Sequence, residues 1–153
     1  MVAICLTIFT TNANSQCNCQ TLTKDGSEVM QCPVKPIAAD NSIQIGIGLG
    51  ETSNTLYLSL SIRYRYTAQK VTDNLTITLA NGKIVELKLL NSGLAYIGNS
   101  EICQSTFLID ENDKSLLKKS TIKTFAFYLE DQLRHLLPIT LNKNILQSQL
   151  NCL

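Results

Sequence analysis

The chain has 153 residues, of which 44% are hydrophobic and 16% are charged. Average proteins carry about 25% charged residues, so this composition is too apolar for a disordered chain and predicts a folded core. The net charge is +1 and the pI is about 7.5. A nucleic-acid-binding protein usually presents a strongly basic face, so this balance predicts no nucleic-acid partner. The length suits a single domain.

The first residues have the pattern of an export signal. Residues 2–10 are mostly apolar or hydroxylated, and a polar run follows them. The small residues Ala13 and Ser15 predict a signal peptide over residues 1–15, cleaved before Gln16; cleavage after Ala13 is the second choice, and a buried N-terminal strand is the alternative to a leader. The apolar run of about nine residues is shorter than the ~20 needed to span a bilayer, so no transmembrane segment is predicted.

The six cysteines also favour export, because disulfide bonds persist mainly in oxidising compartments outside the cytosol. Removal of the leader takes away Cys5 and leaves an odd number of cysteines, so one thiol is expected to stay free or to pair between chains. The predicted disulfides are Cys103 with Cys152, and Cys32 with either Cys17 or Cys19. We therefore expect an exported protein, periplasmic or extracellular, with disulfide bonds.

The N-terminal half reads as an irregular arm followed by strands. Residues 16–40 contain an Asp-Gly turn signal and two prolines, which predict an irregular arm with a short strand near Val29–Cys32. From Ile43 to Leu49, apolar residues alternate mainly with glycines, which predicts a strand with room for close packing on one face. Strict alternation over Thr55–Thr67 predicts a long, half-buried antiparallel strand.

The segment from Leu75 to Leu90 contains Asn81-Gly82 between two apolar runs, a strong signal for a β-hairpin. A two-residue turn would place charged residues opposite apolar ones. A three-residue loop over residues 80–82 instead pairs Ile77 with Val85 and Leu75 with Leu87. A shift of one residue would turn every side chain to the wrong face, so the longer loop is predicted.

The remaining elements alternate between strands and short helices. They are a loop around 94–100, a strand over 103–109, a helix from 110 to 119, a strand over 121–129, a short helix over 131–137 and a final amphipathic helix over 141–152. A calcium loop is the alternative for the acidic start of the first helix, but it lacks the EF-hand glycine and twelfth-position glutamate. The order predicts an α+β fold, an antiparallel β-sheet with short helices late in the chain packed on one face, in a single domain over 16–153.

Residues 75–128 combine the hairpin, the strand Cys103–Ile109, an acidic short helix with Leu116 and Leu117, and then Ile122-Lys123-Thr124-Phe125. This pattern resembles small uncharacterised exported proteins of Bacteroidetes-type bacteria. The resemblance covers about a third of the chain and includes no catalytic motif. It implies a periplasmic or envelope location and supplies no site residues.

Catalytic and metal-binding signatures are weak. His135 is the only histidine, so a Ser-His-Asp or Cys-His mechanism would have to use it, and we interpret it as a surface or helix-end residue. A zinc site is the alternative use of His135, but its spacing from the cysteines does not match common zinc motifs. The residues considered for that zinc site are Cys17, Cys19, Cys32 and His135. The carboxylates considered for glycoside hydrolysis are Glu51, Glu86, Glu101 and Glu130, whose spacing predicts no pairing.

The most specific surface feature is the outward face of the Thr55–Thr67 strand, with Tyr57, Arg63 and Arg65. Arginine offers a planar fork for carboxylate or phosphate groups, and tyrosine offers a large amphipathic contact. An ordinary solvated sheet face is the alternative. We predict a binding or structural interaction module of the cell envelope without a cofactor, whose partner is an envelope protein or a small anionic ligand. A small secreted hydrolase using unidentified carboxylates is the second hypothesis.

Overall fold

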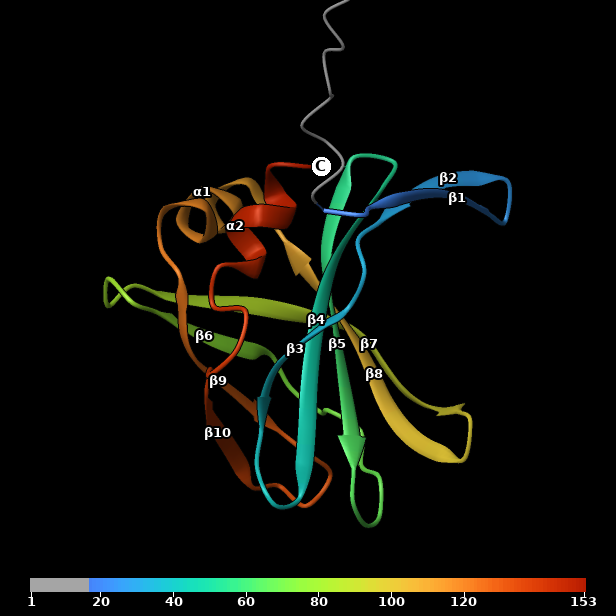
Figure 1. Ribbon diagram of the computed structural model, residues 1–153, viewed down its shortest axis with the longest axis vertical. Coiled ribbons are helices and arrows are strands. Elements are labelled where there is room, and N and C mark those ends of the chain that lie inside the picture. Colours follow the sequence, from blue (N-terminus) through green and yellow to red (C-terminus); the bar gives the residue numbers. More distant parts are fainter. Residues whose placement is uncertain (1–16) are drawn as a thin grey trace, which may run out of the picture.

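The computed structural model describes residues 17–153, so the predicted leader and its cleavage site before Gln16 lie outside the described residues. Strands dominate the described chain (Figure 1). The strands are β1 Gln20–Lys24, β2 Ser27–Gln31, β3 Lys35–Ala39, β4 Ile43–Thr52, β5 Thr55–Tyr64, β6 Leu75–Leu79, β7 Ile84–Ile97, β8 Ser100–Ile109, β9 Ile122–Tyr128 and β10 Arg134–Pro138. The helices are α1 Glu111–Lys119 and α2 Ile145–Leu150.

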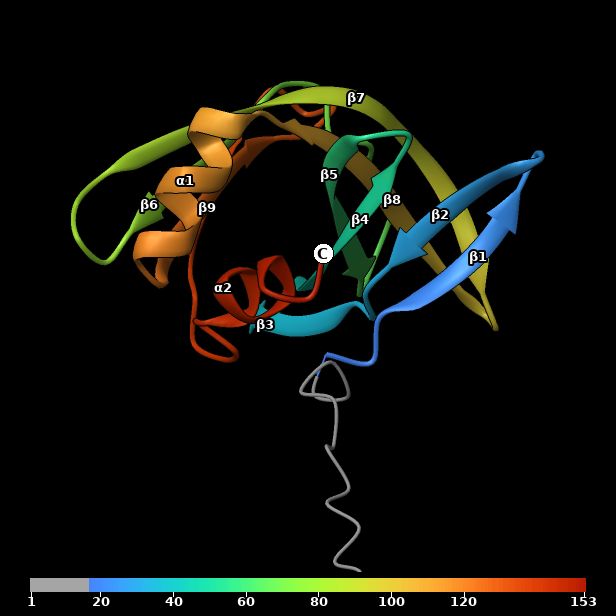
Figure 2. The same cartoon turned by 90° about the horizontal axis from the view of Figure 1, so that it is seen from above.

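These strands form one antiparallel sheet in the order β1-β2-β4-β5-β8-β7-β6-β9-β10, and β3 also pairs with β4. The sheet curls until the segment after β10 reaches β3, where the N–H of Thr140 donates to the carbonyl of Ile37 at 3.0 Å. Seen from above, the strands surround α2 (Figure 2). We call this nearly closed arrangement the cylinder.

The alternating pattern of β5 builds the centre of the core. Leu58, Leu60 and Ile62 are fully buried, and burial of each such side chain contributes about 1.5–3 kcal/mol. The predicted β6–β7 hairpin is confirmed in register, with Ile77 opposite Val85 and Leu75 opposite Leu87. The buried apolar residues of the strands and of both helices form one continuous core.

Three predicted elements need correction. The N-terminal arm is more regular than predicted: β2 matches the expected short strand near Val29–Cys32, while β1 and β3 are additional strands of the sheet. The predicted loop around 94–100 is the tip of the long β7–β8 hairpin. The predicted helix over 131–137 is strand β10, which pairs with β9 from Arg134 opposite Tyr128 to Pro138 opposite Thr124. The local sequence favours a helix, but pairing with the free edge of β9 satisfies the backbone N–H and C=O groups of that strand, so the segment forms a strand.

The structure is nearly all-β with two short helices late in the chain, so the α+β description holds only roughly. Both helices lie at the same end of the cylinder (Figure 1). Helix α1 begins with a capping box in which the side chain of Asp110 accepts from the N–H of Asp113. Helix α2 is shorter than predicted, and its buried Gln149 accepts from the N–H of Leu49 at 2.8 Å and donates to the carbonyl of Pro33 at 2.9 Å.

Two disulfide bonds hold the ends of the described chain. Cys19 pairs with Cys32, one of the two predicted alternatives, and Cys17 pairs with Cys152. The predicted bond between Cys103 and Cys152 is therefore wrong. Cys103 is a free, fully buried thiol on β8, and its sulfur lies 3.4 Å from the hydroxyl oxygens of two serines, Ser92 and Ser105.

The position of Cys152 explains this pairing, because the chain end after α2 lies beside the start of the described chain (Figure 1). The two disulfide bonds indicate an oxidising, exported location. No helix of residues 17–153 has the length and apolar character needed to cross a membrane.

Candidate functional site

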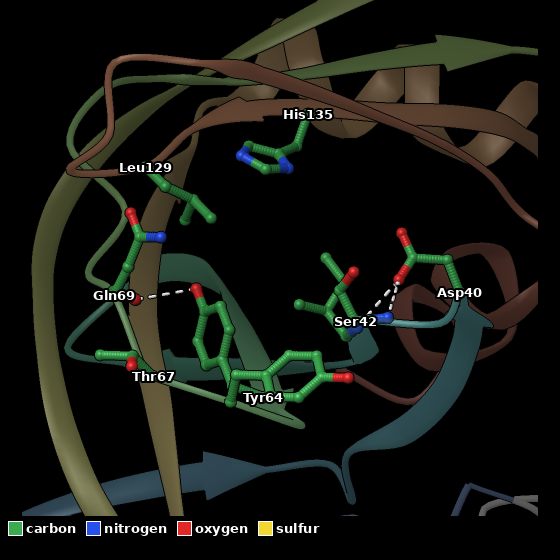
Figure 3. Close-up of a pocket in the computed structure, with 9 residues that line it drawn as sticks. Asp40, Ser42, Tyr64, Thr67, Gln69, Leu129 and His135 are labelled. Atoms are coloured by element: carbon green, nitrogen blue, oxygen red, sulfur yellow. Dashed lines mark hydrogen bonds between the residues drawn. The ribbon is translucent and has the colours of Figure 1, made fainter.

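A hollow of about 240 Å³ lies at the end of the cylinder opposite the two helices, and we call it the end hollow. Its walls come from separate segments: the β3–β4 turn, the end of β5 and the chain after it, and the β9–β10 region. The lining residues are Asp40, Ser42, Ile43, Tyr64, Tyr66, Thr67, Gln69, Leu129 and His135. Figure 3 shows side chains from these segments surrounding one open space.

The β3–β4 turn is held by Asp40. Its Oδ1 accepts from the N–H of Ser42 at 2.6 Å and from the N–H of Ile43 at 2.9 Å (Figure 3). This side-chain bonding to the backbone two and three residues ahead is the usual reason for Asp at a turn. The turn therefore presents Asp40 and Ser42 to the end hollow in a defined conformation.

Tyr64 forms the opposite wall. It is the last residue of β5 and follows Ile62 on the inward face, as the period of two requires. Its hydroxyl donates to the carbonyl of Gln69 at 2.8 Å. Burial raises the pKa of Tyr64 above its ordinary value, so the side chain stays a neutral hydrogen-bonding group.

His135 projects into the hollow from β10 (Figure 3). Its ring stacks on Phe127, with centroids 5.9 Å apart. Its Nε2 is buried and lies 3.4 Å from Oδ2 of Asp131, an ion-pair distance without the alignment of a hydrogen bond, and it has no hydrogen-bond partner within residues 17–153. The N–H of Leu133 and, to a smaller degree, His135 lower the pKa of Asp131.

The predicted helix-end position of His135 is wrong, because the residue lies on strand β10, whereas its 31% exposed side chain agrees with the surface alternative and lines a hollow. A hydrolase mechanism would need a nucleophile bonded to this ring. In the part of the chain that the structure describes, no hydroxyl or thiol is hydrogen-bonded to His135.

A second hollow of about 400 Å³ adjoins the first, and we call it the arginine hollow. Arg63 and Arg65 line it together with Asn41 and Gln44, and it shares Asp40, Ser42, Ile43 and Tyr64 with the end hollow. Arg65 lies over the ring of Tyr66, 5.7 Å from the centroid. Among residues 17–153 the one contact at ion-pair distance is that of His135, which is charged only when protonated, with Asp131, so both arginines lack a carboxylate partner.

Tyr57 lines neither the end hollow nor the arginine hollow. It is six residues before Arg63 on β5, a separation of about 20 Å along a strand. It lines a third hollow of about 540 Å³ beside the β1–β2 hairpin, which we call the hairpin groove. The structure thus brings Arg63 and Arg65 into one hollow and places Tyr57, the third residue of the predicted contact face, in another.

The carboxylates considered for hydrolysis are not paired in these hollows. The end hollow and the arginine hollow share the single carboxylate Asp40, and the hairpin groove contains only Asp25. Glu86 accepts from the side chain of Asn74, and Glu130 accepts from the N–H of Lys70. Hydrolysis by two carboxylates needs both around one bond, so these hollows give that mechanism no support.

The three cysteines of the zinc alternative, Cys17, Cys19 and Cys32, are all in disulfide bonds. The described residues contain no cluster of three or more His, Cys, Asp or Glu side chains arranged to hold a metal ion.

Sequence reasoning missed the grouping of Asp40, Ser42, Gln69 and His135. The only available signal was the turn-forming run Asp40-Asn41-Ser42, which indicates a turn and says nothing of its distant neighbours. Comparison with family models, curated proteins and solved structures found no match. The resemblance to exported proteins of Bacteroidetes-type bacteria therefore stays a prediction.

Proposed function

We propose that this chain is an exported binding module of the cell envelope, periplasmic or extracellular, and that it binds a small ligand with an anionic group. The ligand occupies the end hollow and the arginine hollow together. Its anionic group, a carboxylate or phosphate, contacts Arg63 and Arg65. The rest of the ligand lies against Tyr64 and His135.

The observation that carries this proposal is the pair of arginines without carboxylate partners beside a hollow lined by convergent polar side chains. Arginine is always charged, and its planar fork matches the oxygens of carboxylate and phosphate groups. Asp40 is the only acidic residue in either hollow, and one of its oxygens already accepts two backbone N–H groups. The arginine hollow thus has a net positive charge.

The end hollow supplies the second part of the argument. The ring of His135 lines this hollow, while its Nε2 is buried against the carboxylate of Asp131, 3.4 Å away, so the ring offers a contact surface and not a free hydrogen-bonding atom. Binding sites combine an apolar wall with a few polar groups that orient the ligand. Leu129 and Ile43 provide such a wall beside His135.

A titration of the ¹⁵N-labelled protein followed by NMR tests the proposal, with inorganic phosphate and citrate as probes. We expect amide shifts concentrated at Ser42–Gln44 and Arg63–Arg65. The double variant Arg63→Ala with Arg65→Ala should lose these shifts. The matched control is Lys118→Ala with Lys119→Ala, which removes the same charge from α1 and should bind both anions as the unmodified protein does.

Anion-induced shifts that persist in the double arginine variant would contradict the proposal. Shifts that the lysine control also abolishes would show a general effect of net charge. If neither anion shifts these amides, while a purified envelope protein binds and the arginine variant does not bind it, the small-ligand proposal is wrong and the surface is a protein contact.

A further inference from the structure

The hairpin groove lies on the outer face of the sheet, and its floor is the ring of Tyr57. Tyr57 pairs with Gly50 across strands β5 and β4, and its ring lies directly over that glycine, so that a Cβ at position 50 would overlap the ring. Burial raises the pKa of Tyr57. The ring is therefore held against the sheet, and its remaining surface lines the groove.

Two apolar side chains flank this aromatic floor. Leu90 occupies the β-bulge of β7, where the register with β8 shifts between Leu89 and Asn91, and it is 50% exposed. Bulges redirect side chains and are frequent beside functional sites. Val29 approaches from β2. The groove thus has a narrow apolar strip made of Tyr57, Leu90 and Val29.

Hydroxyl groups surround the strip. The lining hydroxyl residues are Ser27, Thr52, Thr55, Ser59 and Thr106. None of these side chains, nor the amide of Gln31, makes a hydrogen bond to another group in residues 17–153. The charged residues are Lys24 and Asp25, whose opposite charges cancel. The groove therefore offers many free neutral donors and acceptors and no net charge.

We infer that the hairpin groove is a second binding site, for a neutral saccharide. A sugar ring presents an apolar C–H face, which packs on an aromatic ring, and a rim of hydroxyl groups, which pair with serine, threonine and glutamine side chains. An anionic ligand would need an uncompensated positive charge, which the groove lacks. A proline-rich peptide usually needs a groove lined by several aromatic rings, and Tyr57 is the only ring here. This inference is independent of the proposed anion site.

Titration of the ¹⁵N-labelled protein with maltotriose, cellotriose and tri-N-acetylchitotriose tests the inference. At about 10 mM sugar, a site with a Kd of about 1 mM is nearly saturated. We expect at least one trisaccharide to shift the amides of Tyr57, Ser59, Leu90 and Thr106. Tyr57→Ala should weaken that binding about tenfold or more, because it removes the central aromatic contact.

Tyr57→Phe is the matched variant, since it keeps the ring on Gly50 and should retain most of the affinity. Arg63→Ala with Arg65→Ala changes β5 near its end and the residue just after it, outside the groove, and should leave sugar binding unchanged. If Tyr57→Ala fails to fold, Ser59→Val with Thr106→Val replaces it and should also lose binding. The absence of shifts with all three trisaccharides, unchanged affinity in a folded groove variant, or binding of a proline-rich peptide alone would overturn the inference.

Discussion

Tyr64 links the packing of the core to the wall of the end hollow. As the last residue of β5 it points inward, yet its hydroxyl reaches the carbonyl of Gln69 in the chain that follows. Partial burial disfavours the charged phenolate and raises the pKa of Tyr64. Because the folded state disfavours the charged phenolate, ionisation of Tyr64 lowers the stability of the fold.

The unmodified protein should lose stability as the pH rises above about 10. We predict that this loss is smaller in Tyr64→Phe. An unfolded tyrosine loses its proton near pH 10, whereas folded Tyr64 keeps it, so the free energy of unfolding falls as the pH rises above about 10. Near neutral pH both states are protonated, and the variant loses only the hydrogen bond to Gln69, about 1 kcal/mol. Urea unfolding at a series of pH values measures both effects.

The control is Tyr96→Phe, because Tyr96 is 75% exposed. Its profile should follow that of the unmodified protein at every pH. Parallel profiles for Tyr64→Phe and the unmodified protein above pH 10 would contradict the buried, neutral state of Tyr64.

At the scale of elements, α2 completes the edge of β4. Strands β2 and β3 pair with successive parts of β4, and the chain between them leaves a gap near Leu49. The amide of Gln149 bridges this gap by bonding the N–H of Leu49 and the carbonyl of Pro33. A helix side chain thus replaces the missing backbone partner, which explains a buried glutamine in an apolar core.

Gln149→Leu should lower the free energy of unfolding by about 2–4 kcal/mol. The substitution puts an apolar side chain of similar size in place of the amide and leaves the buried N–H of Leu49 and the partly buried carbonyl of Pro33 without partners, at a cost of about 1–3 kcal/mol for a buried group. Denaturant unfolding checks this value. Ser148→Ala changes the exposed neighbour on the same helix and should have an effect within about 0.5 kcal/mol. Equal effects of the two variants would show that the bridge contributes nothing.

For the whole molecule, the disulfide between Cys17 and Cys152 joins positions 135 residues apart, whereas Cys19 and Cys32 are 13 apart. In the chain-entropy model, a cross-link restricts the unfolded chain more when it closes a longer loop. The terminal disulfide also ties the first described residues to the end of α2. It therefore connects the β1 edge of the sheet to the helical end of the cylinder.

Cys17→Ser with Cys152→Ser should therefore destabilise the protein more than Cys19→Ser with Cys32→Ser. The chain-entropy model gives a stabilisation of roughly 5 kcal/mol for the long loop and roughly 3 kcal/mol for the short one. Denaturant unfolding of the two double variants measures the difference in their free energies of unfolding. The free thiol of Cys103 is present in both variants and therefore does not contribute to that difference. A larger loss for the short-loop variant would contradict the entropic explanation.

Local patterns in the sequence determined most of the strands. The alternation from Thr55 and the Asn81-Gly82 turn predicted β5 and the register of β6 with β7, because a strand's facing and a hairpin's pairing depend on residues close together in the chain. The same alternation predicted one strand face for Arg63 and Arg65; β5 ends at Tyr64, so Arg65 lies in the chain after it, yet both arginines line the arginine hollow.

Only the tertiary structure decided the rest. Strand β10, the pairing of Cys152 with Cys17, and the meeting of Asp40, Tyr64 and His135 all depend on how the sheet curls. The physical reason is that these features join segments far apart in sequence. Such contacts are set by free strand edges and by closure of the cylinder, which no local period of the sequence encodes.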